Sequence, residues 1–166
     1  MSQTISTLTT GHDAKSRAIG APDREWLSYG GLQSLAVKVR KQLHEIGIGR
    51  GDRVAIVLPN GPEMATAFFS IAQAATTAPL NPAYREEEYE FYLDDLKAKA
   101  LVVSADYDGP AISAAQKVNI AVLRLSYRPS DPAGCFTLSS DVNFDNCDNS
   151  LPRHDDVALI LHTSGT

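Results

Sequence analysis

Apolar residues along the chain follow two alternating spacings. Over residues 31–46 they recur at intervals of three and four, which places them on one face of a helix. They are Leu32, Leu35, Ala36, Val39, Leu43 and Ile46. We expect this helix to end at Gly47, because glycine adopts the left-handed conformation of a helix end without a side-chain penalty.

Short apolar runs and further helical patterns follow in alternation. Residues 54–58 form a continuous run rich in β-branched side chains, typical of a strand buried on both faces. Further strands are predicted at 77–80, 101–103, 120–125 and 157–161, and helices at 62–75, 85–97 and 111–118. The last strand is expected to be buried. Repeated β-α units predict an α/β fold with a largely parallel sheet and right-handed crossovers.

Two polar stretches interrupt this pattern. Residues 1–20 are rich in Ser and Thr and predict a flexible leader, so the domain is expected to occupy residues 21–166. Residues 126–156 contain several Pro, Gly, Asp and Asn, which predicts a long surface loop with a possible short strand at 136–138.

Composition narrows the function classes. The 166 residues are 43% hydrophobic and 21% charged, with a formal net charge of −5 and scattered basic residues, so no nucleic-acid partner is expected. No apolar run is long enough to cross a bilayer, and the first residues lack the apolar stretch of a secretory signal. A cytoplasmic protein is expected. Cys135 and Cys147 lack metal-ligand spacing and are interpreted as ordinary loop residues in a reducing compartment.

The C-terminal residues have the composition of an anion cradle. The predicted strand 157–161 leads through His162 into Thr163, Ser164, Gly165 and Thr166. Gly165 allows backbone N–H groups to converge, and the three hydroxyls can donate to phosphate oxygens. Ligands of open α/β sheets bind beyond the carboxyl ends of the strands. A simple β-turn is the alternative for these residues taken alone.

Five short motifs, in order, resemble the N-terminal part of the adenylate-forming superfamily of acyl-CoA synthetases, luciferases and peptide-synthetase adenylation domains. The resemblance covers roughly residues 20–166. It is carried by Leu27-Ser28-Tyr29 with Leu32, by residues 47–55, by Leu58-Pro59-Asn60, by Pro79-Leu80-Asn81-Pro82 and by residues 161–166. Residues 81–84 and 161–164 look most similar to the 4-coumarate and oxalate CoA-ligase branch.

The resemblance implies a chemistry. Members attach a carboxylate to the α-phosphate of ATP, release pyrophosphate and transfer the acyl group to a thiol, usually coenzyme A, with Mg²⁺ stabilising the phosphates. Thr163, Ser164, Gly165 and Thr166 would then hold the β- and γ-phosphates of ATP. The family's second glycine-rich stretch, its lysines and its acyl pocket have no counterpart in this sequence. We therefore expect no catalytic residue here and no activity of the chain alone, and a peroxisomal address could only lie beyond Thr166.

Other candidate groups have simpler interpretations. His162 is expected to pack at the end of its strand rather than to act in catalysis. Glu86, Glu87 and Glu88 are interpreted as a solvated first helical turn and not as a metal site. Two alternatives to a ligase remain open at this point: a non-catalytic module that binds a nucleotide or partner chain, and an unrelated α/β protein whose loop mimics the motif.

Overall fold

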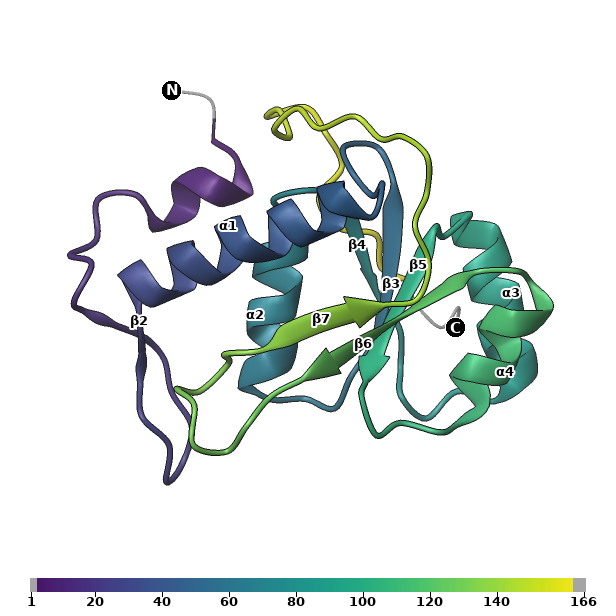
Figure 1. Cartoon of the computed structure of the whole chain (residues 1–166), viewed down its shortest axis with the longest axis horizontal. Coiled ribbons are helices and arrows are strands. Elements are labelled where there is room, and N and C mark those ends of the chain that lie inside the picture. Colours follow the sequence, from purple (N-terminus) through teal and green to yellow (C-terminus); the bar gives the residue numbers. More distant parts are fainter. Residues whose placement is uncertain (1–2, 163–166) are drawn as a thin grey trace.

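The computed structural model describes residues 3–162 and contains a five-stranded sheet in the order β4-β3-β5-β6-β7 (Figure 1). Strands β4, β3, β5 and β6 are parallel, and β7 runs antiparallel to β6. The predicted α/β class with a largely parallel sheet is confirmed. Among residues 3–162, no helix combines the length and apolar character that a membrane crossing requires.

Most elements lie within a few residues of their predicted positions. The helices are α1 (Tyr29–Glu45), α2 (Pro62–Ile71), α3 (Glu86–Leu96) and α4 (Pro110–Lys117). The sheet strands are β3 (Arg53–Val57), β4 (Thr76–Pro79), β5 (Ala100–Ser104), β6 (Ala121–Ser126) and β7 (Thr137–Ser140). The possible strand at 136–138 is therefore β7. Helix α2 ends four residues before the predicted limit of residue 75, and its C-cap is Ala72.

Helices cover both faces of the sheet, as a buried parallel sheet requires. Figure 1 shows α1 and α2 on one side and α3 and α4 on the other. The sheet residues alternate accordingly: Val54 and Ile56 belong to the core under α1 and α2, while Ala55 and Val57 belong to the core under α3 and α4. The run at 54–58 is buried throughout, as predicted.

The ends of α1 follow from single residues. The Ser28 hydroxyl accepts a hydrogen bond from the Gly31 N–H (3.1 Å) and caps the first turn. Gly47 follows the helix with φ +79°, in the left-handed region, as the sequence predicts. The long loop after β7 returns over this helix end, where the Phe144 N–H donates to the Ile46 carbonyl (2.9 Å).

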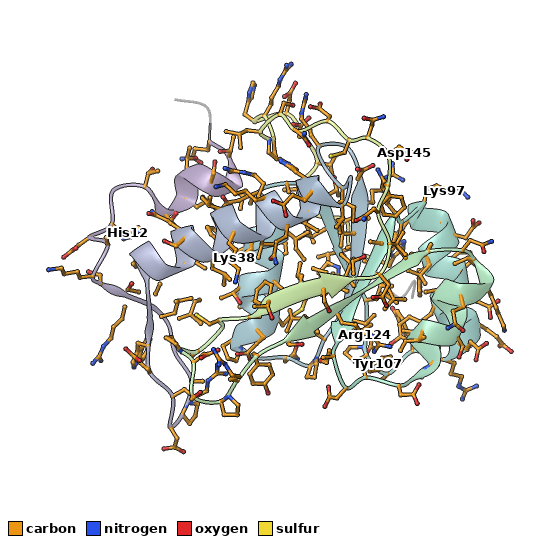
Figure 2. The ribbon with its side chains drawn as sticks, in the orientation of Figure 1. His12, Lys38, Lys97, Tyr107, Arg124 and Asp145 are labelled. Atoms are coloured by element: carbon orange, nitrogen blue, oxygen red, sulfur yellow. The ribbon has the colours of Figure 1, made fainter. Side chains whose placement is uncertain are left out.

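The connection that follows β5 is held by a side chain of the neighbouring strand β6. Figure 2 shows Arg124 of β6 beside Tyr107, which follows β5. The Arg124 guanidinium donates to the Tyr107 carbonyl (2.5 Å) and fixes the connection between β5 and α4.

Residues 3–20 contain two elements that the sequence analysis missed. Ile5–Thr9 form the 3-10 helix η1, and β1 (Arg17–Ile19) pairs antiparallel with β2 (Leu27–Ser28). The Gln33 amide donates to the Thr9 carbonyl (3.1 Å) and holds η1 against α1. The division into a flexible leader at 1–20 and a domain at 21–166 stays a prediction.

The prediction of a buried strand at 157–161 is wrong for this structure. The segment makes a single parallel bridge, Thr77 to Leu159, and the side chains of Val157, Leu159 and Leu161 are 59%, 39% and 62% exposed. The reason is its position: it lies outside β4 at the edge of the sheet, and no strand among residues 3–162 pairs with its outer side. Its apolar composition resembles that of a central strand, but three of its five side chains are exposed to solvent.

Candidate phosphate-binding edge of the sheet

Residues 157–162, here called the edge segment, run beside β4 and lead into the predicted phosphate-binding residues. The Thr77 N–H and hydroxyl both donate to the Ala158 carbonyl (2.9 and 2.8 Å), and the Ile160 N–H donates to the Thr77 carbonyl (2.9 Å). The Thr76 hydroxyl donates to the Val157 carbonyl (2.6 Å). Because the pairing is parallel, the edge segment points toward the carboxyl ends of the sheet strands.

An ion pair fixes the amino end of the edge segment. The Arg50 guanidinium donates through Nε and Nη2 to the two oxygens of Asp156 (2.5 and 2.7 Å), the residue just before the segment. The Arg153 N–H also donates to this carboxylate (2.6 Å). These hydrogen bonds lower the pKa of Asp156 to about 2, and the one from Arg50 has the largest effect. Asp156 is therefore ionised at neutral pH.

Helix α3 fixes the opposite end. The His162 Nε2 lies 3.2 Å from Asp95 Oδ2, and its ring packs on Tyr92 with 4.5 Å between ring centroids. His162 Nδ1 is buried and has no hydrogen-bond partner among the described residues. His162 therefore packs at the end of the segment, as predicted.

Stacked tyrosines support this contact. Tyr84 stacks on Tyr92 with 4.9 Å between ring centroids, and Tyr89 meets Tyr84 edge-on at 5.8 Å. The Tyr89 hydroxyl donates to the Asn81 carbonyl (2.8 Å). A hydrogen bond with Tyr92 raises the pKa of Tyr84, and burial raises that of Tyr89. The phenols of Tyr84 and Tyr89 thus stay protonated at neutral pH and act as packing groups and neutral hydrogen-bond partners.

The predicted phosphate-binding residues Thr163, Ser164, Gly165 and Thr166 lie outside the described residues. What the structure shows is their approach: the edge segment beside β4, held at Asp156 and at His162. No local sequence pattern pointed to the Arg50–Asp156 or Asp95–His162 contacts. Each joins residues far apart in the chain, 106 and 67 positions, so only the fold brings them together.

The remaining candidates have structural contacts. Glu86 and Glu90 both pair with Lys117 of α4 (2.5 and 2.6 Å), and Glu88 accepts from the Arg85 N–H (2.9 Å) at the start of α3. Between residues 3 and 162 no three His, Cys, Asp or Glu side chains cluster in a way that could hold a metal ion. Cys135 and Cys147 are free and half-buried, and burial raises the pKa of both thiols.

Comparison with known proteins identifies the class. A family model described as AMP-binding enzyme matches residues 9–166. The chain is 38% identical over 158 residues to an oxalate–CoA ligase of Arabidopsis thaliana, a match that covers 87% of this chain and 30% of that enzyme. It is 28% identical over 157 residues to 4-coumarate–CoA ligase 1 of Petroselinum crispum, covering 92% of this chain and 28% of that enzyme.

Solved structures agree. The structure of apo MatB from Rhodopseudomonas palustris is similar to this chain, with a TM-score of 0.76 and 24% sequence identity. The match covers 100% of this chain and 33% of the MatB chain. For ATP-bound MatB the TM-score is 0.67 and the sequence identity 25%, and the match covers 75% of this chain and 25% of the MatB chain. The fold is that of the N-terminal portion of such enzymes.

The chain belongs to the AMP-binding enzyme family. Its relatives include oxalate–CoA and 4-coumarate–CoA ligases, as the resemblance predicted, and it spans about 30% of the length of the relatives named here.

Proposed function

We propose that this chain is the N-terminal portion of an ATP-dependent acid–CoA ligase that forms an acyl-adenylate and transfers the acyl group to CoA. The edge segment is the observation that carries the proposal. It runs parallel to β4 toward the carboxyl ends of the strands, where ligands of open α/β sheets bind. It is held at both ends by Arg50–Asp156 and Asp95–His162.

In this proposal Thr163, Ser164, Gly165 and Thr166 hold the β- and γ-phosphates of ATP. Three hydroxyl donors and a glycine that frees the backbone suit a phosphate group. Bound ATP supplies the electrophilic α-phosphate to which the carboxylate of the acid substrate is attached. The described residues fit a positioning role, because they direct the chain to the sheet edge. They offer no cluster of ligands for Mg²⁺, so we assign the ion no residue in this part of the chain.

We propose further that the 166-residue chain alone does not adenylate an acid. The glycine-rich continuation of the phosphate loop, its lysine and the acyl pocket of the family have no counterpart in this sequence. The Arg50 and His162 contacts orient the backbone, but both bond to carboxylates of the chain itself. The Arg50 and His162 side chains are therefore already bonded within the chain and do not contact a substrate in this proposal.

Pyrophosphate exchange in a chimera tests the proposal. Residues 9–166 would replace the matching part of the Arabidopsis oxalate–CoA ligase, and oxalate-dependent exchange of labelled pyrophosphate into ATP would be measured. We expect exchange by the chimera and none by the purified 166-residue chain. A folded chimera without exchange would contradict the ligase assignment, and exchange by the chain alone would contradict its proposed inactivity.

A further inference from the structure

A cavity lies at the amino ends of β3 and β4, beside the edge segment. It has a volume of about 380 Å³, at the lower end of the range of small-molecule sites. Its wall includes the first residues of two strands, Arg53 of β3 and Thr76 of β4, together with Val157 at the start of the edge segment. Ala158 and Ile160 of the edge segment also line the cavity, and the predicted phosphate-binding residues come after His162 in the sequence.

Chain segments far apart in the sequence close this cavity. The 3-10 helix η1 contributes Ile5 and Leu8, and the loop before the edge segment contributes Arg153 and Asp156. Figure 1 shows η1 alongside α1 and the loop near the C-terminal end of that helix. The hydrogen bonds from Gln33 to Thr9 hold η1 in this position.

Positive charge is in excess around the cavity. Three guanidinium groups, those of Arg50, Arg53 and Arg153, line it together with the one carboxylate of Asp156. Asp156 is bound on both oxygens by Arg50, so its charge is already compensated. Among residues 3–162, no carboxylate lies within salt-bridge distance of Arg53 or Arg153. Arg53 Nη1 donates to the Leu96 carbonyl (2.7 Å), which leaves its other N–H groups for a ligand. Arg153 lies near Asp148 and Asp156 and helps to lower their pKa values, but it forms no ion pair with either, so its guanidinium can still bind an anion.

The rest of the wall is apolar. Ala72, Ala74 and Ala75, which follow α2, form a buried floor. Leu8 and Val157 also line the cavity, although each is more than half exposed to solvent. Exposed large apolar side chains around one cavity favour a ligand that covers them.

We propose that this cavity binds a small aliphatic carboxylate, with its head group at Arg53 and Arg153 and its tail against Leu8, Val157 and the alanine floor. A guanidinium matches a carboxylate with two parallel N–H donors, and the tail removes apolar surface from water. The site is separate from the adenylation chemistry proposed for the phosphate edge. It would serve as an accessory binding site, occupied whether or not the chain takes part in catalysis.

Calorimetric titration of the 166-residue chain with octanoate tests this proposal. We expect saturable binding at one site, with much weaker binding of acetate, which lacks the tail, and of octyltrimethylammonium, which carries the opposite charge on the same tail. Equal binding of octanoate and octyltrimethylammonium would overturn the proposal. So would a heat signal that fails to saturate with octanoate.

Matched variants locate the site. Arg153→Gln is expected to weaken octanoate binding about tenfold, because a charge-assisted contact is lost. Arg128→Gln changes an exposed loop arginine that does not line the cavity, and should leave the affinity unchanged. On the apolar side, Leu8→Gln should weaken binding, whereas Leu151→Gln, at a similarly exposed leucine outside the cavity, should not. Identical affinities within each pair would place the ligand elsewhere and overturn the proposal.

Discussion

Two ion pairs join segments that lie far apart in the sequence. Arg24 pairs with Glu63 at 2.6 Å, and both side chains are nearly buried, at 13% and 14% exposure. Arg24 also donates to the Asp131 and Pro132 carbonyls (3.3 and 3.1 Å). This one guanidinium thus connects the turn after β1, the start of α2 and the loop before β7. The Arg50–Asp156 pair likewise connects the turn before β3 to the start of the edge segment.

Neutralising Glu63 should destabilise the fold. Glu63→Gln keeps the shape of the side chain but leaves the Arg24 charge without its partner in a nearly buried site. We expect the free energy of unfolding in urea to fall by about 2 kcal/mol. Asp94→Asn is the control, because the Asp94–Lys97 pair is about 70% exposed and should be worth less than about 0.5 kcal/mol. Equal effects of the two changes would contradict this view of the Arg24 site.

The Arg50–Asp156 pair predicts a dependence of stability on pH. The pKa of Asp156 falls from its ordinary 3.8 to about 2 in the folded chain, so the folded state favours the ionised form. This contribution is fully present above pH 4 and is lost as the pH falls through 2. The stability difference between the wild type and Asp156→Asn should therefore shrink between pH 4 and 2. Asp141→Asn, at an exposed loop position, should show no such trend, and a constant difference for Asp156→Asn would be inconsistent with the pair.

At the scale of elements, the end of α1 depends on both backbone conformation and space. Gly47 and Gly51 both have positive φ angles, +79° and +88°. A side chain at Gly47 would collide with the Phe144 backbone, whereas nothing lies within 4 Å of the position it would take at Gly51. Substitution of Gly51 therefore tests backbone strain alone, whereas substitution of Gly47 tests strain together with a steric clash.

Alanine at these positions should have unequal effects. Gly51→Ala adds only the strain of a left-handed residue, about 1 kcal/mol. Gly47→Ala adds this strain and displaces the returning loop at Phe144, so its loss of stability in thermal unfolding should clearly exceed that of Gly51→Ala. If the two variants unfold at the same temperature, the loop does not pack on α1 as described.

The edge segment depends on the side chains of β4. The fully buried Thr77 hydroxyl donates to the Ala158 carbonyl, and the Thr77 carbonyl accepts from the Ile160 N–H. Thr77→Val removes the hydroxyl and keeps the shape. Loss of this hydrogen bond should make local opening of the edge segment easier by about 1 kcal/mol, so the Ile160 amide should exchange its hydrogen about fivefold faster. Thr137→Val, the same change in exposed β7, should leave this rate unaltered; an unaltered rate in Thr77→Val would show that the hydroxyl does not hold the segment.

The sequence predicted elements far better than contacts. The helix at Tyr29–Glu45 and the strand at Arg53–Val57 follow from short-range spacing and from the glycine at position 47. The strand at 157–161 was expected to be buried because its composition is that of a central strand. Burial depends on which neighbours the fold supplies, and that information is not local.

At the scale of the whole molecule, the α/β class and the family were both predictable, because repeated β-α units and ordered motifs are properties of the chain itself. The partners of His162 were not. Asp95 and Tyr92 contact it only because α3 packs beside the edge segment. Nor did the pattern reveal the cavity at the amino ends of the strands, whose wall combines η1, the alanines that follow α2 and the loop at 152–156.

The central claim is that the edge segment brings residues 163–166 to the phosphates of ATP, and the oxalate–CoA ligase chimera tests it most directly. Oxalate-dependent pyrophosphate exchange should fall by about 10- to 100-fold in Ser164→Ala, because a hydroxyl donor to a charged phosphate is lost. Ser139→Ala, on an exposed position of β7, should keep full exchange. If Ser164→Ala retained the exchange rate of Ser139→Ala, residues 163–166 would not be the phosphate site.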